Sequence, residues 1–189
     1  VLISSGSIER PLVFGNNDTP GVMLSSAAKE YLKVYGVLVG KKPLIFTNND
    51  SGYETAIEFK KNGVDPIILD TRKEPKSEII DEAKKLDIQI KFSYVVVAAK
   101  GYKKVKSAEV AKISDDKNEL GTLETINCDC ICVSGFWTPT IHLASQSGNK
   151  TTFNKDIDAF VPGLSKQNET TLGAANGTFT LEETLKKSF

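Results

Sequence analysis

The sequence predicts an α/β protein that combines a βαβ domain, a run of antiparallel strands and part of a second α/β body. Three observations support this prediction. Apolar strand-like and helix-like segments alternate between residues 43 and 92. Strand-like segments alone, separated by turn residues, follow from residue 94 to 133. Finally, two strand-like segments that run into glycine, at Gly6 and Gly173, stand near opposite ends of the chain.

Hydrophobic periodicity and turn residues predict the individual elements. A helix over residues 22–35 is predicted from a stripe comprising Ala28, Tyr31, Leu32 and Tyr35. The other expected helices cover residues 51–62, 77–86, 139–147 and 178–187. The expected strands cover residues 1–4, 43–47, 67–70, 88–92, 94–99, 104–113, 121–126, 129–133 and 171–172, with a turn at 115–118. The strands at 43–47 and 67–70 flank a helix, so their connection should be a parallel, right-handed crossover.

The order of the elements predicts two nested bodies. Residues 1–38 and 137–189 should form a discontinuous and incomplete outer body, because neither piece alone has enough surface to bury. Residues 39–136 should form an inner domain inserted between them.

Composition limits the possible functions. The chain has 189 residues, with 24 basic and 24 acidic residues, so its formal net charge is zero. This balance predicts no nucleic-acid partner and no anionic lipid surface. No apolar run reaches the ~18–20 residues of a membrane helix. The sequence begins at Val1 in a strand-like run, which indicates a fragment of a longer polypeptide. Its three cysteines are an odd number in one short segment, which favours a reducing cytoplasm.

The turn after residues 43–47 lies where a dinucleotide fold holds pyrophosphate. Thr47 and Asn49 stand where the first two glycines of that motif belong, and Gly52 stands at the third. The Cβ of residue 49 extends ~1.5 Å into the space that the phosphate would use. The inner domain therefore has a Rossmann-like frame, and its nucleotide site is degenerate or weak.

Further polar residues complete this candidate inner site. Asp50 is expected to cap the following helix. Asp70 lies 23 positions after Thr47, where an acidic residue would bind a ribose hydroxyl, and Arg72 could instead meet a 2′-phosphate. Asn48 and Ser51 belong to the same turn. The same residues are equally consistent with a βαβ unit whose helix is capped and which binds no ligand.

No catalytic or metal-binding constellation is apparent. Cys128, Cys130 and Cys132 alternate along a strand, which predicts one buried face rather than a zinc site. His142 is the only histidine and is expected to pack or cap rather than to act in catalysis. G-x-S-x-G, H-E-x-x-H and C-x-x-C motifs do not occur.

Several longer segments carry a family resemblance. They are Ser5-Gly6-Ser7-Ile8-Glu9-Arg10-Pro11-Leu12-Val13-Phe14, Pro20-Gly21-Val22-Met23-Leu24, Phe46-Thr47-Asn48-Asn49-Asp50-Ser51-Gly52-Tyr53, Ser134-Gly135-Phe136-Trp137-Thr138-Pro139-Thr140-Ile141-His142-Leu143 and Gly173-Ala174-Ala175-Asn176-Gly177-Thr178-Phe179. The first resembles the A-T-G-A-x-E-R-P segment of flavoproteins with two dinucleotide-binding domains. Together they resemble the alpha subunit of heterotetrameric sarcosine oxidases, over nearly the whole chain.

The resemblance implies a function for the whole enzyme. Such enzymes oxidise the N-methyl group of sarcosine and release glycine. They use FAD in the beta subunit and FMN at the alpha–beta interface, and they produce peroxide. The resemblance also implies gamma and delta subunits, NAD in the alpha chain, and a tetrahydrofolate-binding region outside these residues. The resemblance further implies that the outer body is FAD/NAD-binding-like and is part of a disulfide-reductase-like region. The first glycine-rich motif of that region also lies outside these residues.

The resemblance places an outer cofactor site at Ser5, Gly6, Gly173, Ala174 and Asn176. Flavoproteins of this architecture carry an Asp after the glycine of the late turn, where it binds the flavin ribityl chain. Ala174 stands at that position here, which argues against FAD and favours NAD in the outer body.

Two other functions stay open at this point. One is a pyridine-nucleotide disulfide reductase that transfers hydride from NADPH, although the missing C-x-x-C weighs against it. The other is a structural scaffold in which neither nucleotide site binds a ligand.

Overall fold

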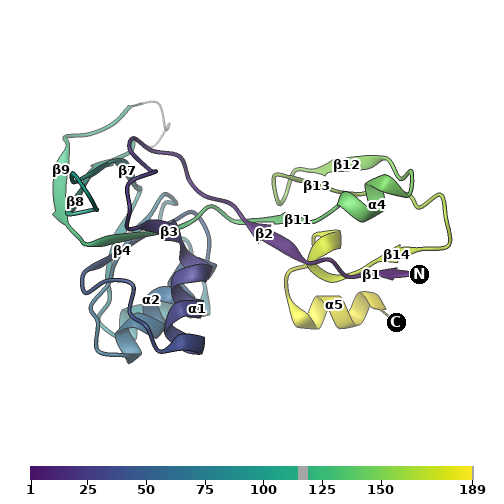
Figure 1. The fold of residues 1–189 in the computed structure, drawn as a ribbon, viewed down its shortest axis with the longest axis horizontal. Coiled ribbons are helices and arrows are strands. Elements are labelled where there is room, and N and C mark those ends of the chain that lie inside the picture. The colour runs from purple at the N-terminus through teal and green to yellow at the C-terminus, as the bar shows by residue number, and fades with distance from the viewer. Residues whose placement is uncertain (115–118, 189) are drawn as a thin grey trace. The chain divides into compact units, whose positions relative to one another are not determined.

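A computed structural model of the chain describes residues 1–114 and 119–188. The chain divides into two compact units (Figure 1). The first unit joins Val1–Arg10 to the chain from Trp137 onward, and the second unit is Pro11–Phe136. Residues 11–38, expected in the outer body, therefore lie in the second unit. They do so because the strand formed by Val22–Leu24 pairs with the sheet of that unit.

A five-stranded parallel sheet forms the centre of the second unit. Its strand order is β3-β10-β4-β5-β6. The strands are β3 (Val22–Leu24), β10 (Cys130–Ser134), β4 (Pro43–Thr47), β5 (Ile67–Asp70) and β6 (Gln89–Phe92). All four neighbouring pairs are parallel, and the pairing of β4 with β5 confirms the parallel connection predicted for these two strands. Both β4 and β10 are buried along their whole length, as expected for central strands covered on both faces.

Three helices cover one face of this sheet. They are α1 (Ser25–Tyr35), α2 (Ser51–Lys61) and α3 (Glu78–Lys85). A hydrophobic cluster that includes Leu32, Phe59 and Ile80 from the helices and Ile45 and Ile68 from the sheet fills this interface.

The helix predicted from residue 22 begins at Ser25, because Val22–Leu24 pairs in register with Ile131–Val133 as a strand. The predicted buried stripe of α1 is only half right. Ala28 and Leu32 are buried, whereas Tyr31 and Tyr35 are exposed.

An antiparallel meander covers the opposite face of the sheet (Figure 1). It consists of β7 (Tyr94–Lys100), β8 (Ser107–Lys112) and β9 (Glu124–Asn127) in that order. Its core side chains, among them Val96 and Val110, pack against Leu44, Phe46 and Val133 of the sheet. The last two strands are shorter than predicted. The turn predicted at 115–118 lies outside the described residues.

The first unit contains three strand pairs. β1 (Leu2–Ile3) pairs in parallel with β14 (Thr170–Thr171). β2 (Ser7–Glu9) is antiparallel to β11 (Trp137–Pro139), and β12 (Thr151–Asn154) is antiparallel to β13 (Ala159–Pro162). The hairpin of β12 and β13 was not predicted, since its polar sequence shows little alternation. Phe153 and Phe160 pair across it with ring centroids 5.3 Å apart.

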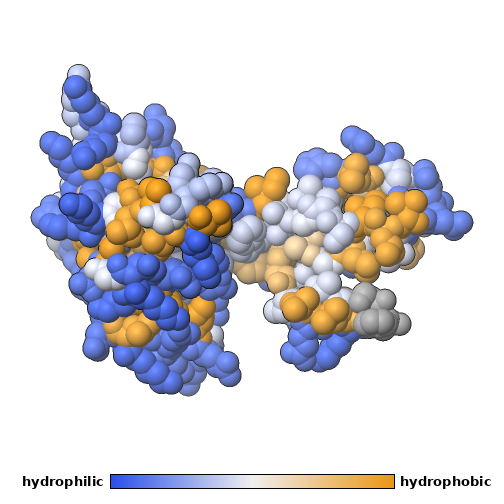
Figure 2. Space-filling view, turned by 60° about the horizontal axis from the view of Figure 1, so that its bottom comes forward, coloured by the Kyte–Doolittle hydropathy of each residue, from blue (hydrophilic) through white to orange (hydrophobic). Residues whose placement is uncertain are grey.

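The two helices predicted in the first unit are shorter than expected, and a 3-10 helix that was not predicted lies between them in the sequence. They are α4 (His142–Gln146), the 3-10 helix η1 (Gly173–Asn176) and α5 (Leu181–Ser188). The helix expected from residue 139 starts at His142 because residues 137–139 pair with β2 as a strand. Apolar patches remain on the surface of both units in Figure 2.

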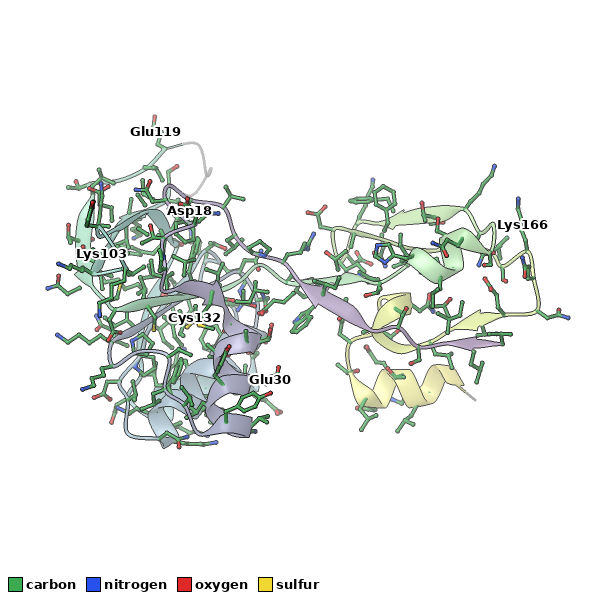
Figure 3. All side chains as sticks on the ribbon, viewed as in Figure 1. Asp18, Glu30, Lys103, Glu119, Cys132 and Lys166 are labelled. Atoms are coloured by element: carbon green, nitrogen blue, oxygen red, sulfur yellow. The ribbon has the colours of Figure 1, made fainter. Side chains whose placement is uncertain are left out.

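The three cysteines are buried, but they do not share one face. Cys130 and Cys132 pack in the cluster beneath the helices, and Figure 3 shows Cys132 within the second unit. Cys128 precedes β10 and packs on the meander side. The prediction of a single face was wrong for Cys128, because the regular alternation of the strand begins only at Cys130. Within the described residues, none of the helices combines the length and the apolar character needed to cross a bilayer.

Candidate functional site

The inner candidate residues lie at the carboxyl edge of the parallel sheet. Thr47 ends β4, Asp70 ends β5 and Ser134 ends β10. The chain continues from β4 to β5 and β6 on one side, while β10 and β3 lie on the other side of β4. The order of strands therefore reverses between β4 and β10. In open α/β sheets, ligands bind in the crevice at such a switch point.

The side chain of Asn49 lies across this switch point. Its Nδ2 donates hydrogen bonds to the carbonyl oxygen of Ser134 at 3.0 Å and to Ser134 Oγ at 3.2 Å. The same amide group also contacts Asn48 Oδ1 at 2.9 Å. Thr47 Oγ1 donates to the carbonyl of Asn49 at 2.8 Å and accepts from its backbone N–H at 3.1 Å. Asn49 is only 5% exposed, so these contacts occupy the interior of the turn.

The first amide of α2 is bound within the protein. Ser51 N–H donates to Asn49 Oδ1 at 2.9 Å, and Ser51 Oγ bonds the same oxygen. The expectation that Asp50 caps the helix was wrong, since its side chain makes no capping hydrogen bond. Asp50 instead forms an ion pair with Arg72 at 2.8 Å. Asn49 is better placed than Asp50 to accept from Ser51, because an Asn or Asp side chain reaches the N–H two residues on.

Asp70 is fully buried and is held by two neighbours. Tyr53 OH donates to Asp70 Oδ2 at 2.7 Å. Arg72 donates from Nη2 to the same oxygen at 2.8 Å, and from its backbone N–H and Nε to Asp70 Oδ1 at 2.9 Å and 3.1 Å. Asp70 therefore has hydrogen-bond donors on both carboxylate oxygens.

The electrostatics of this cluster favour the protonated forms of Tyr53 and Arg72. Burial raises the pKa of the Tyr53 hydroxyl, and its hydrogen bond to Asp70 raises it further. Burial alone would lower the pKa of Arg72, but the hydrogen bonds and charges of Asp70 and Asp50 outweigh this effect and leave it raised. The cluster thus acts as a fixed anchor between α2 and β5 rather than as a proton donor.

The structure brings the inner candidates together in two groups, and both include a residue that sequence reasoning missed. Ser134 belongs with Asn49 and Ser51, and Tyr53 belongs with Asp70 and Arg72. Ser134 could have been found, because it directly follows the strand predicted over residues 129–133. Nothing in the sequence marks Tyr53 as a partner of Asp70.

The outer candidates gather at the carboxyl ends of β1 and β14. Ile3 pairs with Thr171, and Leu172 N–H continues the ladder with a 2.9 Å bond to the carbonyl of Ile3. A Cβ built on Gly173 would lie 4.0 Å from Ser4 Oγ. The turns that follow the two strands, expected to meet from opposite ends of the sequence, therefore lie together.

The backbone at this outer edge requires glycine. Gly6 has φ +76° and Gly173 has φ +66°, a region that other residues rarely adopt. A Cβ added at Gly6 would meet no atom within 4 Å. Ser5 Oγ donates to the carbonyl of Thr140 at 2.7 Å, so this hydroxyl fixes the neighbouring loop. Ala174 and Asn176 lie in η1, directly after Gly173.

His142 is exposed at the start of α4, contrary to the expected packing role. Among residues 1–114 and 119–188, no group of three His, Cys, Asp or Glu side chains is arranged to hold a metal ion.

Curated relatives match almost the whole chain. It is 38% identical over 185 residues to sarcosine oxidase subunit alpha of Rhizobium meliloti (strain 1021), which covers 94% of this chain. It is 33% identical over 181 residues to the subunit of the same name from Corynebacterium sp. (strain P-1), which covers 95% of the chain. The chain spans only 17–18% of the length of these relatives. No protein-family model matches it.

Solved structures share the fold at low sequence identity. Thioredoxin reductase of T. acidophilum superposes with a TM-score of 0.75 at 16% identity, covering 97% of this chain and 60% of that protein. Lactococcus lactis thioredoxin reductase gives 0.71 at 16% identity, with the same coverage. L-proline dehydrogenase from P. horikoshii gives 0.59 at 20% identity, covering 93% of this chain and 29% of that protein.

These matches confirm two predictions made from the sequence. The α/β fold class, with its parallel sheet and meander, is the one found in these reductases and this dehydrogenase. The resemblance to sarcosine oxidases is carried by relatives that cover nearly all of the chain at 30–38% identity. The chain is therefore a relative of the sarcosine oxidase alpha subunits, matched over 94–95% of its own residues at 30–38% identity.

Proposed function

We propose that this chain is the nucleotide-binding and subunit-contact portion of the alpha subunit of a sarcosine oxidase-type enzyme. In that enzyme, sarcosine is oxidatively demethylated to glycine by FAD in a beta subunit and FMN at the interface. The chain itself contributes no catalytic side chain. Gamma and delta subunits complete the assembly, tetrahydrofolate binds in a region outside this chain, and the complex is cytoplasmic. The names of the curated relatives support this proposal.

The outer edge is the proposed NAD site, formed by Ser5, Gly6, Gly173, Ala174 and Asn176. One observation favours it. The space around the Cβ position of Gly6 is open for at least 4 Å, so its bare backbone can approach a ligand. The meeting of the carboxyl ends of two parallel strands and their glycine turns at this edge also supports a dinucleotide site.

Calorimetry on the full-length alpha chain tests the outer site. NAD should titrate to one site per chain, and Gly6→Ala should weaken its binding about tenfold or more, since a methyl group would occupy the ligand's space. Gly148→Ala is the matched control, because Gly148 lies in the same unit with φ +93° and has no atom within 3.8 Å of its Cβ position. Equal affinities in both variants would contradict the proposed site.

The activity is tested separately by adding the beta partner. The assembled full-length subunits should produce peroxide only when sarcosine is present. An assembly that binds no flavin and ignores sarcosine would refute the proposed reaction.

Two alternatives make different predictions. A pyridine-nucleotide disulfide reductase would show a flavin spectrum that NADPH bleaches, and the missing C-x-x-C speaks against it. A scaffold without nucleotide sites would give no saturable heat with NAD.

A further inference from the structure

The second unit, Pro11–Phe136, is inserted between the two parts of the first unit in the sequence. It has the strand arrangement of a dinucleotide site at the switch point between β4 and β10. A bound pyrophosphate would lie at the start of α2, against the backbone N–H groups of the turn after β4. Only one glycine of that turn is present, Gly52. A Cβ at Gly52 would lie 2.7 Å from both Cβ and Oγ1 of Thr47, so this glycine serves the close packing of helix on strand. The packing glycine of the motif is therefore present, whereas Thr47 replaces the glycine of the tight turn and Asn49 replaces the glycine that lets the backbone approach the pyrophosphate.

Asn49 fills the position left by the second of these glycines. Its Oδ1 accepts the N–H of Ser51, which is the first amide of α2 and the donor that a phosphate oxygen would need. Its Nδ2 bonds both the carbonyl and the hydroxyl of Ser134 across the switch point. Hydrogen bonds thereby hold both polar atoms of the Asn49 amide, and the residue is 5% exposed.

The ribose end of the same frame is also occupied. Asp70 would have to offer its carboxylate to two ribose hydroxyls, yet it is fully buried and bonded to Tyr53 and Arg72. Arg72 in turn bridges Asp70 and Asp50, with 2.8 Å to each, so it does not extend toward a 2′-phosphate. A dinucleotide would have to break these internal contacts at both of its ends.

We propose that Asn49 is an internal occupant of the phosphate position and that the inserted unit consequently binds no dinucleotide. NAD, implied by the fold family at this edge, does not fit the residues present. The inference goes beyond the proposed function, which concerns the first unit only. It assigns Asn49 as the residue that determines the lack of nucleotide binding, with Asp70 and Arg72 as a second, internally paired element.

Hydrogen exchange measured by mass spectrometry on the full-length alpha chain gives a local readout of each edge. In the wild-type chain, millimolar NAD should leave exchange in peptides covering residues 47–55 unchanged. In Asn49→Gly, NAD should slow exchange there, with an apparent affinity about tenfold or more above the wild type, as expected for one charge-assisted hydrogen bond gained. Asn62→Gly, the same substitution at the exposed far end of α2, should behave as the wild type.

Two results would overturn the inference. One is NAD-dependent protection of residues 47–55 in the wild-type chain, which needs no variant at all. The other is a folded Asn49→Gly chain that gains no protection, which would show that Asn49 is not what excludes the ligand. Protection at residues 3–6 and 172–177 reports the outer site in the same experiment. Failure of the proposed function would therefore appear there and not at residues 47–55.

Discussion

Tyr53 and Asp70 are joined by a hydrogen bond of 2.7 Å between the phenol OH and Oδ2, and both side chains are fully buried. The bond connects the first turn of α2 to the carboxyl end of β5. The phenol supplies one of the donors that a buried carboxylate requires, and Arg72 supplies the others.

Removing this hydroxyl should destabilise the second unit. Tyr53→Phe keeps the ring in the helix-side core but leaves Asp70 Oδ2 with one donor fewer. We expect a loss of about 1.5–3 kcal/mol in the free energy of unfolding, the range for a hydrogen bond to a charged group. Urea denaturation of the variant measures it. Tyr102→Phe is the control, because Tyr102 is 92% exposed, and equal stabilities of the two variants would disprove the role given to the bond.

The tight contact between Gly52 and Thr47 predicts an unusual response to alanine. In an open helical position, Gly→Ala stabilises by about 0.5–1 kcal/mol. Here the added Cβ would lie 2.7 Å from Thr47, so Gly52→Ala should instead cost about 1–3 kcal/mol. The cost should shrink when the same change is made in a Thr47→Gly background. A double-mutant cycle by chemical denaturation gives both numbers, and an unchanged cost in the second background would contradict the clash.

The orientation of α1 can be tested with two truncations on the same helix. Leu32 is 8% exposed and packs in the core, so Leu32→Ala should cost about 2–5 kcal/mol through lost burial and a residual cavity. Val34 is 65% exposed, so Val34→Ala should change stability by less than about 0.5 kcal/mol. Thermal or urea unfolding measures both losses. A larger loss for Val34→Ala than for Leu32→Ala would contradict the orientation of α1 on the sheet.

Cys128 should make stability depend on alkaline pH. Burial, followed by the neighbouring Cys130 and Asp129, raises the pKa of its thiol from the usual 9.0 to about 12. A raised folded-state pKa favours the folded protein while the thiol is protonated in both states. That contribution is fully present below pH 9 and is lost as the pH rises toward 12.

The corresponding measurement compares the wild type with Cys128→Ala by urea unfolding between pH 7 and 10.5. Above pH 9 the wild type should lose stability faster than the variant, by up to about 1.4 kcal/mol per pH unit. Parallel pH profiles would show that the thiol titrates normally in the folded state.

The regular part of the fold could be predicted because local pattern and tertiary context agree there. The apolar run before Thr47 and the glycine after α2 give β4 and α2 nearly correct bounds. Val22–Leu24 shows the limit of this approach. Its three apolar residues continue the helical pattern of α1, and only pairing with β10, more than a hundred residues later, makes them a strand.

The inner site could be predicted in its position but not in its bonding. The spacing of Thr47, Asn49 and Gly52 located the turn, since it depends on local chain geometry. The bonds from Asn49 to Ser134 and from Tyr53 to Asp70 depend on which strands become neighbours in the sheet. That strand order could not be predicted from the local sequence pattern. Asp50 was expected to cap α2, but the local reach of Asn49 to the Ser51 N–H fills that role, and Asp50 pairs with Arg72.

The pairing of Leu2 with Thr170 has a consequence for biosynthesis. Translation delivers Pro11–Phe136 as one contiguous stretch, so this unit can fold on the ribosome as soon as β10 emerges. β1 must wait for β14, which is synthesised about 170 residues later. A nascent chain arrested once β10 has left the ribosome should therefore resist protease across Pro11–Phe136, while Val1–Arg10 is still cleaved.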